Sequence, residues 1–222
     1  MGFVPSMTAV LSDLPWQRQL WPRVMAHWRL KLFAILGFTA VFFAAYFRTL
    51  KYPAFPVTVM PTTALDRLIG FHPSALLLYV SLWVYAPLAP MLLVQKRKLL
   101  AYGSAVGAIS LAGLAIFYFW PTSIPRPDVD WARYPGFEFL KTIDRSGNAC
   151  PSLHVTFAVY SAIWFDRLLR RMRAPGPVRI LNGCWCLGIL YSTLATRQHV
   201  ALDLYAGAAL GAIGALFPPR LD

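Results

Sequence analysis

Residues Leu100–Trp120 read LAYGSAVGAISLAGLAIFYFW, a run without a single charged side chain. A helix needs about 20 apolar residues to cross the hydrocarbon core of a membrane, so this run is long enough to span one. The rest of the chain has the same character, because 58% of its 222 residues are hydrophobic, 14% are charged and the mean hydropathy is +0.53. This composition excludes an ordinary soluble domain and indicates a helical protein that crosses the membrane several times.

Six segments in all are apolar enough to be spans. They are Leu30–Phe47, Ser74–Val94, Leu100–Trp120, Ser152–Leu169, Val178–Thr196 and Val200–Phe217. We therefore predict an all-α, polytopic fold in which residues 30–222 form one domain of six transmembrane helices. Residues 1–29 carry tryptophans among arginines and lack the short apolar core of a cleaved signal, so they are predicted to form an amphipathic segment on the membrane surface.

The basic residues fall mainly before the first span and in the second and fourth connections. They include Arg18, Arg23, Arg29, Lys31, Lys96, Arg97, Lys98, Arg167, Arg170, Arg171, Arg173 and Arg179. Because short cytoplasmic segments of membrane proteins are rich in Lys and Arg, this pattern predicts that both termini are cytoplasmic and the odd connections external. Membrane orientation thus explains the net charge of +12, and nucleic acid is not an expected partner.

Two polar clusters interrupt this apolar chain at the ends of predicted spans. The first is Asn148–His154, in which Pro151 opens the fourth span. Ser152 is then expected to present its hydroxyl and backbone N–H at a helix N-terminus, a favourable site for an anion, with His154 in the same turn. Ionisable side chains at such boundaries are costly to desolvate, so they indicate chemistry at the membrane surface.

The second cluster contains His199 and Asp203, which are four positions apart and so are predicted to share a helix face. The aspartate can accept a hydrogen bond from the imidazole Nδ1, which leaves Nε2 free as a nucleophile. A third element is Arg126, between two prolines in the long external loop, whose planar guanidinium suits phosphate oxygens. Taken singly, these residues are also compatible with an interfacial histidine, a helix cap and a solvated arginine.

Together the three elements resemble the motifs of the type 2 phosphatidic acid phosphatase superfamily of membrane phosphatases and phosphotransferases. The first family motif is a lysine, six residues and Arg-Pro, and Arg126-Pro127 matches its end. The second is Pro-Ser-Gly-His, and Pro151–His154 matches it with leucine in place of glycine. The third is Ser-Arg, five residues, His, three residues and Asp, and Ser192, His199 and Asp203 match it at the same spacing.

The chain departs from these motifs at two cations. The first-motif lysine position is Phe119, and the third-motif arginine position is Thr193. Arg197 is the favoured replacement, with Arg133, Lys141 or Arg145 as less favoured ones. Three stretches resemble the branch of the superfamily that contains fungal inositol phosphorylceramide synthases. They are Pro-Ser-Leu-His at Pro151–His154, the pair Ser192-Thr193, and residues 65–73.

The resemblance implies a two-step displacement at phosphorus. His199 is expected to attack the phosphoryl group while Asp203 holds its tautomer, and His154 is expected to protonate the leaving oxygen and then deprotonate the incoming nucleophile. The residues expected to bind the phosphate are Arg126, Pro151, Ser152 and Arg197. No metal or other cofactor is expected, because the three cysteines lack metal-site spacing and one aspartate near His199 is too few for a hard cation. Cys150 is expected to be a packing residue, with a reactive thiol as the alternative.

The sequence therefore predicts a lipid phosphatase of the inner (cytoplasmic) membrane with its site on the external face. Its expected substrate is the phosphate or diphosphate of a phospholipid or an isoprenoid. The alternative is a lipid phosphotransferase that passes a phosphoryl or phospho-head group to an alcohol, since water and an alcohol can use the same phosphohistidine. A non-catalytic transporter or lipid-binding protein on the same scaffold is the third hypothesis.

Overall fold

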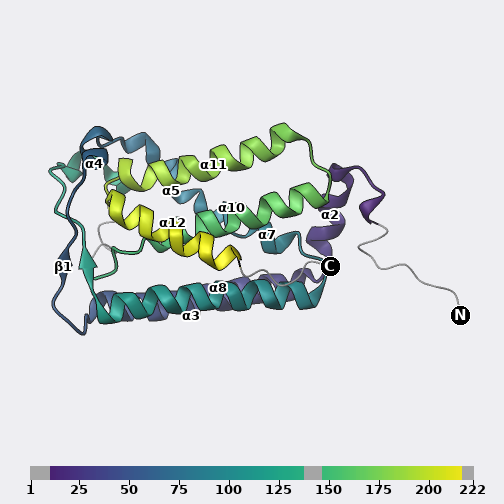
Figure 1. The fold of residues 1–222 in the computed structure, drawn as a ribbon, viewed down its shortest axis with the longest axis horizontal. Coiled ribbons are helices and arrows are strands. Elements are labelled where there is room, and N and C mark those ends of the chain that lie inside the picture. The colour runs from purple at the N-terminus through teal and green to yellow at the C-terminus, as the bar shows by residue number, and fades with distance from the viewer. Residues whose placement is uncertain (1–10, 138–146, 217–222) are drawn as a thin grey trace, which may run out of the picture.

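The computed structural model describes residues 11–137 and 147–216, which form an elongated bundle of helices (Figure 1). The long helices are α3 (Trp28–Lys51), α8 (Lys96–Phe119), α10 (Leu153–Arg171), α11 (Gly176–Ala195) and α12 (Ala201–Leu216). The shorter elements are α2 (Trp16–Met25), α4 (Ala64–Leu68), η1 (Pro73–Ala75), α5 (Leu76–Val80), α6 (Leu82–Tyr85), α7 (Leu88–Met91), η2 (Trp131–Arg133) and η3 (Pro135–Phe137). The predicted helical class is confirmed.

Four stretches are long and apolar enough to cross a membrane. They are Trp28–Lys51, Pro73–Met91, Lys96–Phe119 and Gly176–Ala195. Each coincides with a predicted span, so the chain is a membrane-embedded helical protein. The two other predicted spans correspond to α10, which carries several charged side chains near its end, and to α12, which has 16 residues. That these two helices also cross, and that both termini are cytoplasmic, stay predictions.

The second predicted span is built from several short helices. The chain turns through η1, α5, α6 and α7 between Pro73 and Met91. Pro87 precedes α7 and Pro90 lies within it. Because proline has no N–H to donate, a regular ladder of backbone hydrogen bonds cannot continue through these positions.

Helix α10 is the centre of the bundle and makes its most extensive contacts with α12 and α11. On its inner face Tyr160 and Trp164 are buried against Tyr102 of α8, with ring centroids 5.2 and 5.5 Å from that of Tyr102. Burial of such large side chains is the main source of stability where helices meet. The core therefore fixes α10, which carries the second motif, relative to its neighbours.

Helices α10 and α12 touch through their backbones. A Cβ atom added at Gly207 would meet the carbonyl oxygen of Ser152, and one added at Gly211 would meet that of Thr156. The Thr156 hydroxyl donates to the carbonyls of Ser152 at 2.9 Å and of Gly207 at 3.0 Å. Only glycine permits this approach, and the approach brings the second and third motifs together.

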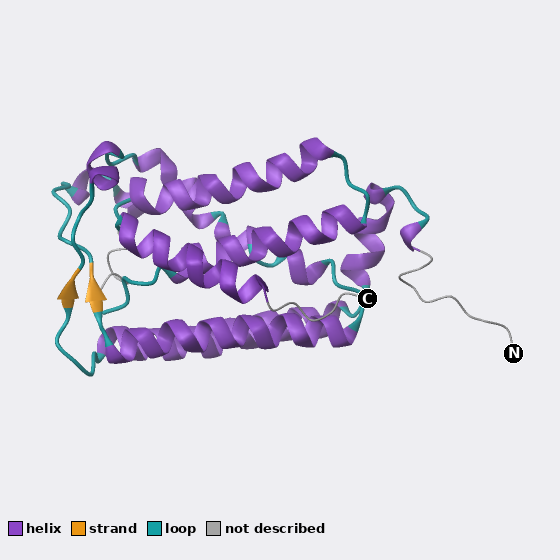
Figure 2. Ribbon diagram, in the orientation of Figure 1, coloured by secondary structure: helices purple, strands orange, loops and turns teal. Residues whose placement is uncertain are grey.

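A small parallel sheet lies at the end of the bundle where α10 begins (Figure 2). Strand β1 (Thr58–Val59) pairs with β2 (Thr122–Ser123), and Thr122 also bridges to Asn148. The buried Thr122 hydroxyl accepts a hydrogen bond from the Cys150 N–H at 2.7 Å. The sheet thereby holds the segment that leads into α10.

The N-terminal segment contains α2, which is attached to the bundle at the other end of α10. The Gln19 side chain donates to the Met172 carbonyl at 3.3 Å. The buried ammonium group of Lys31 donates to the carbonyls of Arg23 at 2.6 Å and Met91 at 2.7 Å. Trp21 is exposed on the other side of α2. That this segment lies on a membrane surface stays a prediction.

Candidate active site

The N-terminus of α10 is formed by Ser152. Its hydroxyl oxygen accepts a hydrogen bond from the Val155 N–H at 3.3 Å, which makes Ser152 the N-cap of the helix. Its own N–H donates to the Asp203 carbonyl at 3.0 Å. The expectation of a free N–H at Ser152 is therefore wrong, because α12 crosses close enough to supply an acceptor. Ser152 itself is fully buried, and its hydroxyl oxygen is used as the cap of α10.

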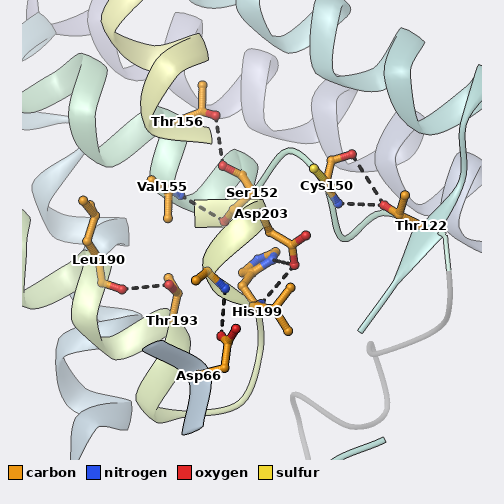
Figure 3. A network of polar contacts seen from close by, with 12 residues as sticks. Asp66, Thr122, Cys150, Ser152, Val155, Thr156, Leu190, Thr193, His199 and Asp203 are labelled. Carbon is orange, nitrogen blue, oxygen red and sulfur yellow. Dashed lines mark hydrogen bonds and ion pairs between the residues drawn. The ribbon is translucent and has the colours of Figure 1, made fainter. Parts of the chain in front are cut away.

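His199 and Asp203 are brought together as the spacing predicts (Figure 3). The distance from His199 Nδ1 to Asp203 Oδ2 is 3.5 Å, with Asp203 fully buried and the His199 side chain 11% exposed. This is an ion-pair contact longer than an ordinary hydrogen bond, and His199 Nδ1 has no hydrogen-bond partner among the described residues. Contacts of this kind in unliganded enzymes often shorten when substrate binds.

The two residues do not share a helix face as predicted. Helix α12 begins at Ala201, so His199 lies in the turn before it. Asp203 reaches back across the first turn of the helix, where its Oδ2 also accepts the Val200 N–H at 3.1 Å. Asp203 therefore places its carboxylate at the N-terminus of α12, next to the imidazole and in a favourable orientation to the helix dipole.

His154 comes from the first turn of α10, the helix whose start lies against α12. It is close enough to His199 for the two imidazoles to interact electrostatically. Its ring stacks on Tyr79 of α5, with centroids 4.0 Å apart and ring planes 11° apart. His154 Nε2 is buried and has no hydrogen-bond partner within the described chain. This nitrogen therefore has a hydrogen-bonding position that the described residues leave unused.

Asp66 is a site residue whose position the sequence reasoning missed. Its Oδ1 accepts the N–H of Ala201 at 2.8 Å, and its Oδ2 accepts the N–H and the hydroxyl of Thr63 at 2.7 and 2.9 Å. The buried carboxylate thus caps α12 from a segment far away in sequence (Figure 3). A Thr followed three positions later by an acidic residue is a helix-start signal, but it identifies only the local cap on α4.

The arginines expected to bind phosphate lie in different settings. Arg197 follows α11 with a left-handed backbone (φ 55°), and its Nη1 donates to the Asp66 carbonyl at 2.9 Å. Arg126 is exposed in the loop after β2. Arg133 is exposed and pairs with Asp130 at 3.1 Å. Lys141 and Arg145 lie outside the described residues. Arg197 is therefore the cation attached most directly to the His199 turn.

The two positions where the family motifs have a lysine and an arginine are occupied here by uncharged residues. Phe119 ends α8 with 69% of its surface exposed and its ring near Phe55. Thr193 is fully buried, and its hydroxyl donates to the Leu190 carbonyl at 2.7 Å. These two positions therefore lack the two cations that the family motifs specify.

Cys150, just before α10, is buried in an apolar cluster with Met60 and Val200. Burial and, to a lesser degree, the negative charge of Asp203 raise the pKa of its thiol to about 12. The thiol is consequently protonated at neutral pH, in agreement with the predicted packing role. Among the described residues no group of His, Cys, Asp and Glu is arranged to hold a metal ion.

A sequence comparison agrees with this arrangement. The sequence profile of the PAP2 superfamily matches residues 98–221, more than half of the chain and the part that contains all three motifs. The match is to the superfamily and does not distinguish a branch within it. No curated protein and no solved structure matches the chain. With His154, His199 and Asp203 held at one end of the bundle, the chain belongs to the PAP2 superfamily, whose members are typically phosphatases or phosphotransferases.

Proposed function

We propose that the protein is an integral-membrane lipid phosphatase that hydrolyses a lipid phosphate or diphosphate through a phosphohistidine at His199. The observation that carries this proposal is the 3.5 Å contact between His199 Nδ1 and the buried Asp203 carboxylate, with His154 on the neighbouring helix. An imidazole whose Nδ1 proton faces a carboxylate exposes Nε2 as the nucleophile.

In the first step His199 Nε2 forms a bond to phosphorus while the bond from phosphorus to the lipid oxygen breaks. The negative charge of the bound phosphate favours the protonated form of His154, which gives its proton to that leaving oxygen. In the second step neutral His154 takes a proton from water, the resulting hydroxide attacks phosphorus, and the bond to His199 breaks. Each step needs one histidine as nucleophile or leaving group and the other as acid or base, and the two motifs supply one each.

The negative charge on the phosphoryl oxygens must be stabilised during both steps. We assign this role to the Ser152 hydroxyl, Arg197 and Arg126, with Pro151 next to Ser152 at the start of α10. Arg197 is fixed near His199 through its hydrogen bond to Asp66, so it needs the least movement to reach a phosphate. Arg126 lies in a loop and would approach as substrate binds.

Transfer of a phospho-head group to an alcohol is the second candidate function. It is favoured by the absence of a cation at Phe119 and at the buried Thr193. A phosphodiester carries one negative charge and a phosphomonoester at neutral pH carries nearly two, so a site with fewer cations suits a diester donor better. The same phosphohistidine would then be attacked by the hydroxyl of an acceptor.

A panel of lipids labelled with ³²P distinguishes these functions. Purified protein in detergent is incubated with phosphatidate, isoprenoid diphosphate and phosphatidylinositol, each with and without an alcohol acceptor. Release of inorganic phosphate supports hydrolysis, and a new labelled lipid that requires the acceptor supports transfer. If neither product forms from any of the lipids at a rate above that of His199→Ala, both proposals fail.

The localisation of the site on the external leaflet is tested by adding a membrane-impermeant substrate to oriented vesicles.

A further inference from the structure

A second group of charged residues lies near the other end of α10, around Asp166. At a rise of 1.5 Å per residue, Asp166 is about 18 Å along the helix from His154. Its carboxylate accepts hydrogen bonds from Arg170 Nε at 2.7 Å and from Arg179 Nε, on α11, at 2.8 Å. Because both bonds come from Nε, Asp166 orients the two guanidiniums while their terminal nitrogens can still donate to the oxygens of an anion such as phosphate.

These residues border a cavity of about 470 Å³ between α10 and α11, which is open along one side of the bundle. Its apolar wall includes Ala162, Ile163 and Gly183. Arg167 also borders the cavity and is fixed by donating to the Ala215 carbonyl at 2.8 Å. Three arginines and one aspartate give the lining a net charge of +2, so the cavity combines positive charge with apolar surface.

We propose that this cavity binds one anionic phospholipid, with its phosphate between Arg170 and Arg179 and the start of an acyl chain along α10 and α11. Charge complementarity selects an anion, and basic pockets between membrane helices bind anionic head groups. The volume and the apolar wall select a lipid over free phosphate, because pockets of 300–1,000 Å³ accommodate molecules of drug size. This site lies away from the histidines, so it is a binding site and not a second substrate position.

The test is photo-cross-linking with a phosphatidylglycerol that carries a diazirine near the top of one acyl chain. Purified protein in detergent is irradiated with the probe, and labelled peptides are identified by mass spectrometry. Labelling is expected in residues 162–183 and is expected to decrease when unlabelled phosphatidylglycerol is added. Each of Arg170→Gln and Arg179→Gln should lower the affinity for the probe about fivefold, which corresponds to roughly 1 kcal/mol per basic residue near a membrane surface.

Arg97→Gln is the matched control. Arg97 is exposed on the first turn of α8, at the same end of the bundle as the end of α10 (Figure 1), and it does not border the cavity. This variant also loses one positive charge, and the probe should label it to the same extent as the wild type. Equal protection by phosphatidylcholine, equal loss in Arg97→Gln, or displacement of the probe by glycerol phosphate or inorganic phosphate would each overturn the proposal. None of these outcomes depends on the activity at His199.

Discussion

The carboxylate of Asp66 accepts the backbone N–H of Ala201 at 2.8 Å, which joins two positions that are 135 residues apart. Ala201 is the first residue of α12 and lies two positions after His199. The Asp66 carbonyl also holds Arg197 at 2.9 Å. The α4 segment therefore supports the histidine turn from both sides of His199.

We expect Asp66→Ala to lower the stability of the protein and Asp66→Asn to retain most of it. Loss of a helix cap costs about 0.5–2 kcal/mol, and buried N–H groups left without an acceptor add about 1–3 kcal/mol. An asparagine oxygen can still accept from Ala201. The measurement is the melting temperature of each variant in the same detergent. Equal melting temperatures for Asp66→Ala and the wild type would contradict the capping role.

Gly207→Ala is expected to separate α10 from α12. The added Cβ would meet the Ser152 carbonyl oxygen, a backbone atom that cannot move away alone. Overpacking of this kind costs about 1–3 kcal/mol, and turnover should decrease along with the melting temperature because the two motifs move apart.

Gly107→Ala on α8 is the control, since an added Cβ there meets nothing within 4 Å. Alanine is a better helix former than glycine, so this variant should be as stable as the wild type or more so. If Gly207→Ala is as stable and active as Gly107→Ala, the close crossing of α10 and α12 is not required.

Tyr79→Leu is expected to lower kcat about three- to tenfold, because stacked aromatic pairs contribute about 0.5–1.5 kcal/mol and here the pair orients the His154 ring. Tyr79→Phe keeps the ring and should retain more activity. The comparison requires the lipid substrate identified in the panel above. A Tyr79→Leu variant with wild-type kcat would show that stacking does not position His154.

Alkylation of Cys150 should be slow at neutral pH. The thiolate is the reactive form, and a pKa of about 12 leaves roughly a thousandfold less thiolate at pH 7–9 than the ordinary value of 9.0 does. In a variant that keeps Cys150 as the only cysteine, the rate of alkylation should rise about tenfold per pH unit up to the highest pH at which the protein stays folded. Asp203→Asn should speed the reaction by removing a negative charge. A rate that matches the denatured chain at pH 7 would contradict this assignment.

The sequence was sufficient for the helical class, the membrane character and the approach of His199 to Asp203. These features depend on long apolar runs and on residues that are close together in the sequence. Both can be recognised without knowing how distant segments pack. The match to the third motif likewise requires only residues 192–203.

The sequence was not sufficient for contacts between distant segments. Tyr79 lies in an apolar run where any aromatic residue would look like a lipid contact, and its role depends on the packing of α5 near α10. The sequence predicts a free N–H at Ser152 because a helix start has unpaired donors, yet the crossing at Gly207 supplies the Asp203 carbonyl as an acceptor. The roles of Tyr79 and Ser152 could therefore be recognised only once the packing of the helices was known.

His199 is proposed to carry the phosphoryl group in a covalent intermediate. This intermediate can be detected by rapid quenching of the enzyme with a ³²P-labelled lipid phosphate, followed by a search for protein-bound label that is stable in base and lost in acid. We expect this label in the wild type, its absence in His199→Ala, and loss of turnover in His154→Ala and Asp203→Asn, with all variants folded in detergent. Wild-type turnover in His199→Ala, or base-stable label that persists in it, would show that His199 is not the nucleophile.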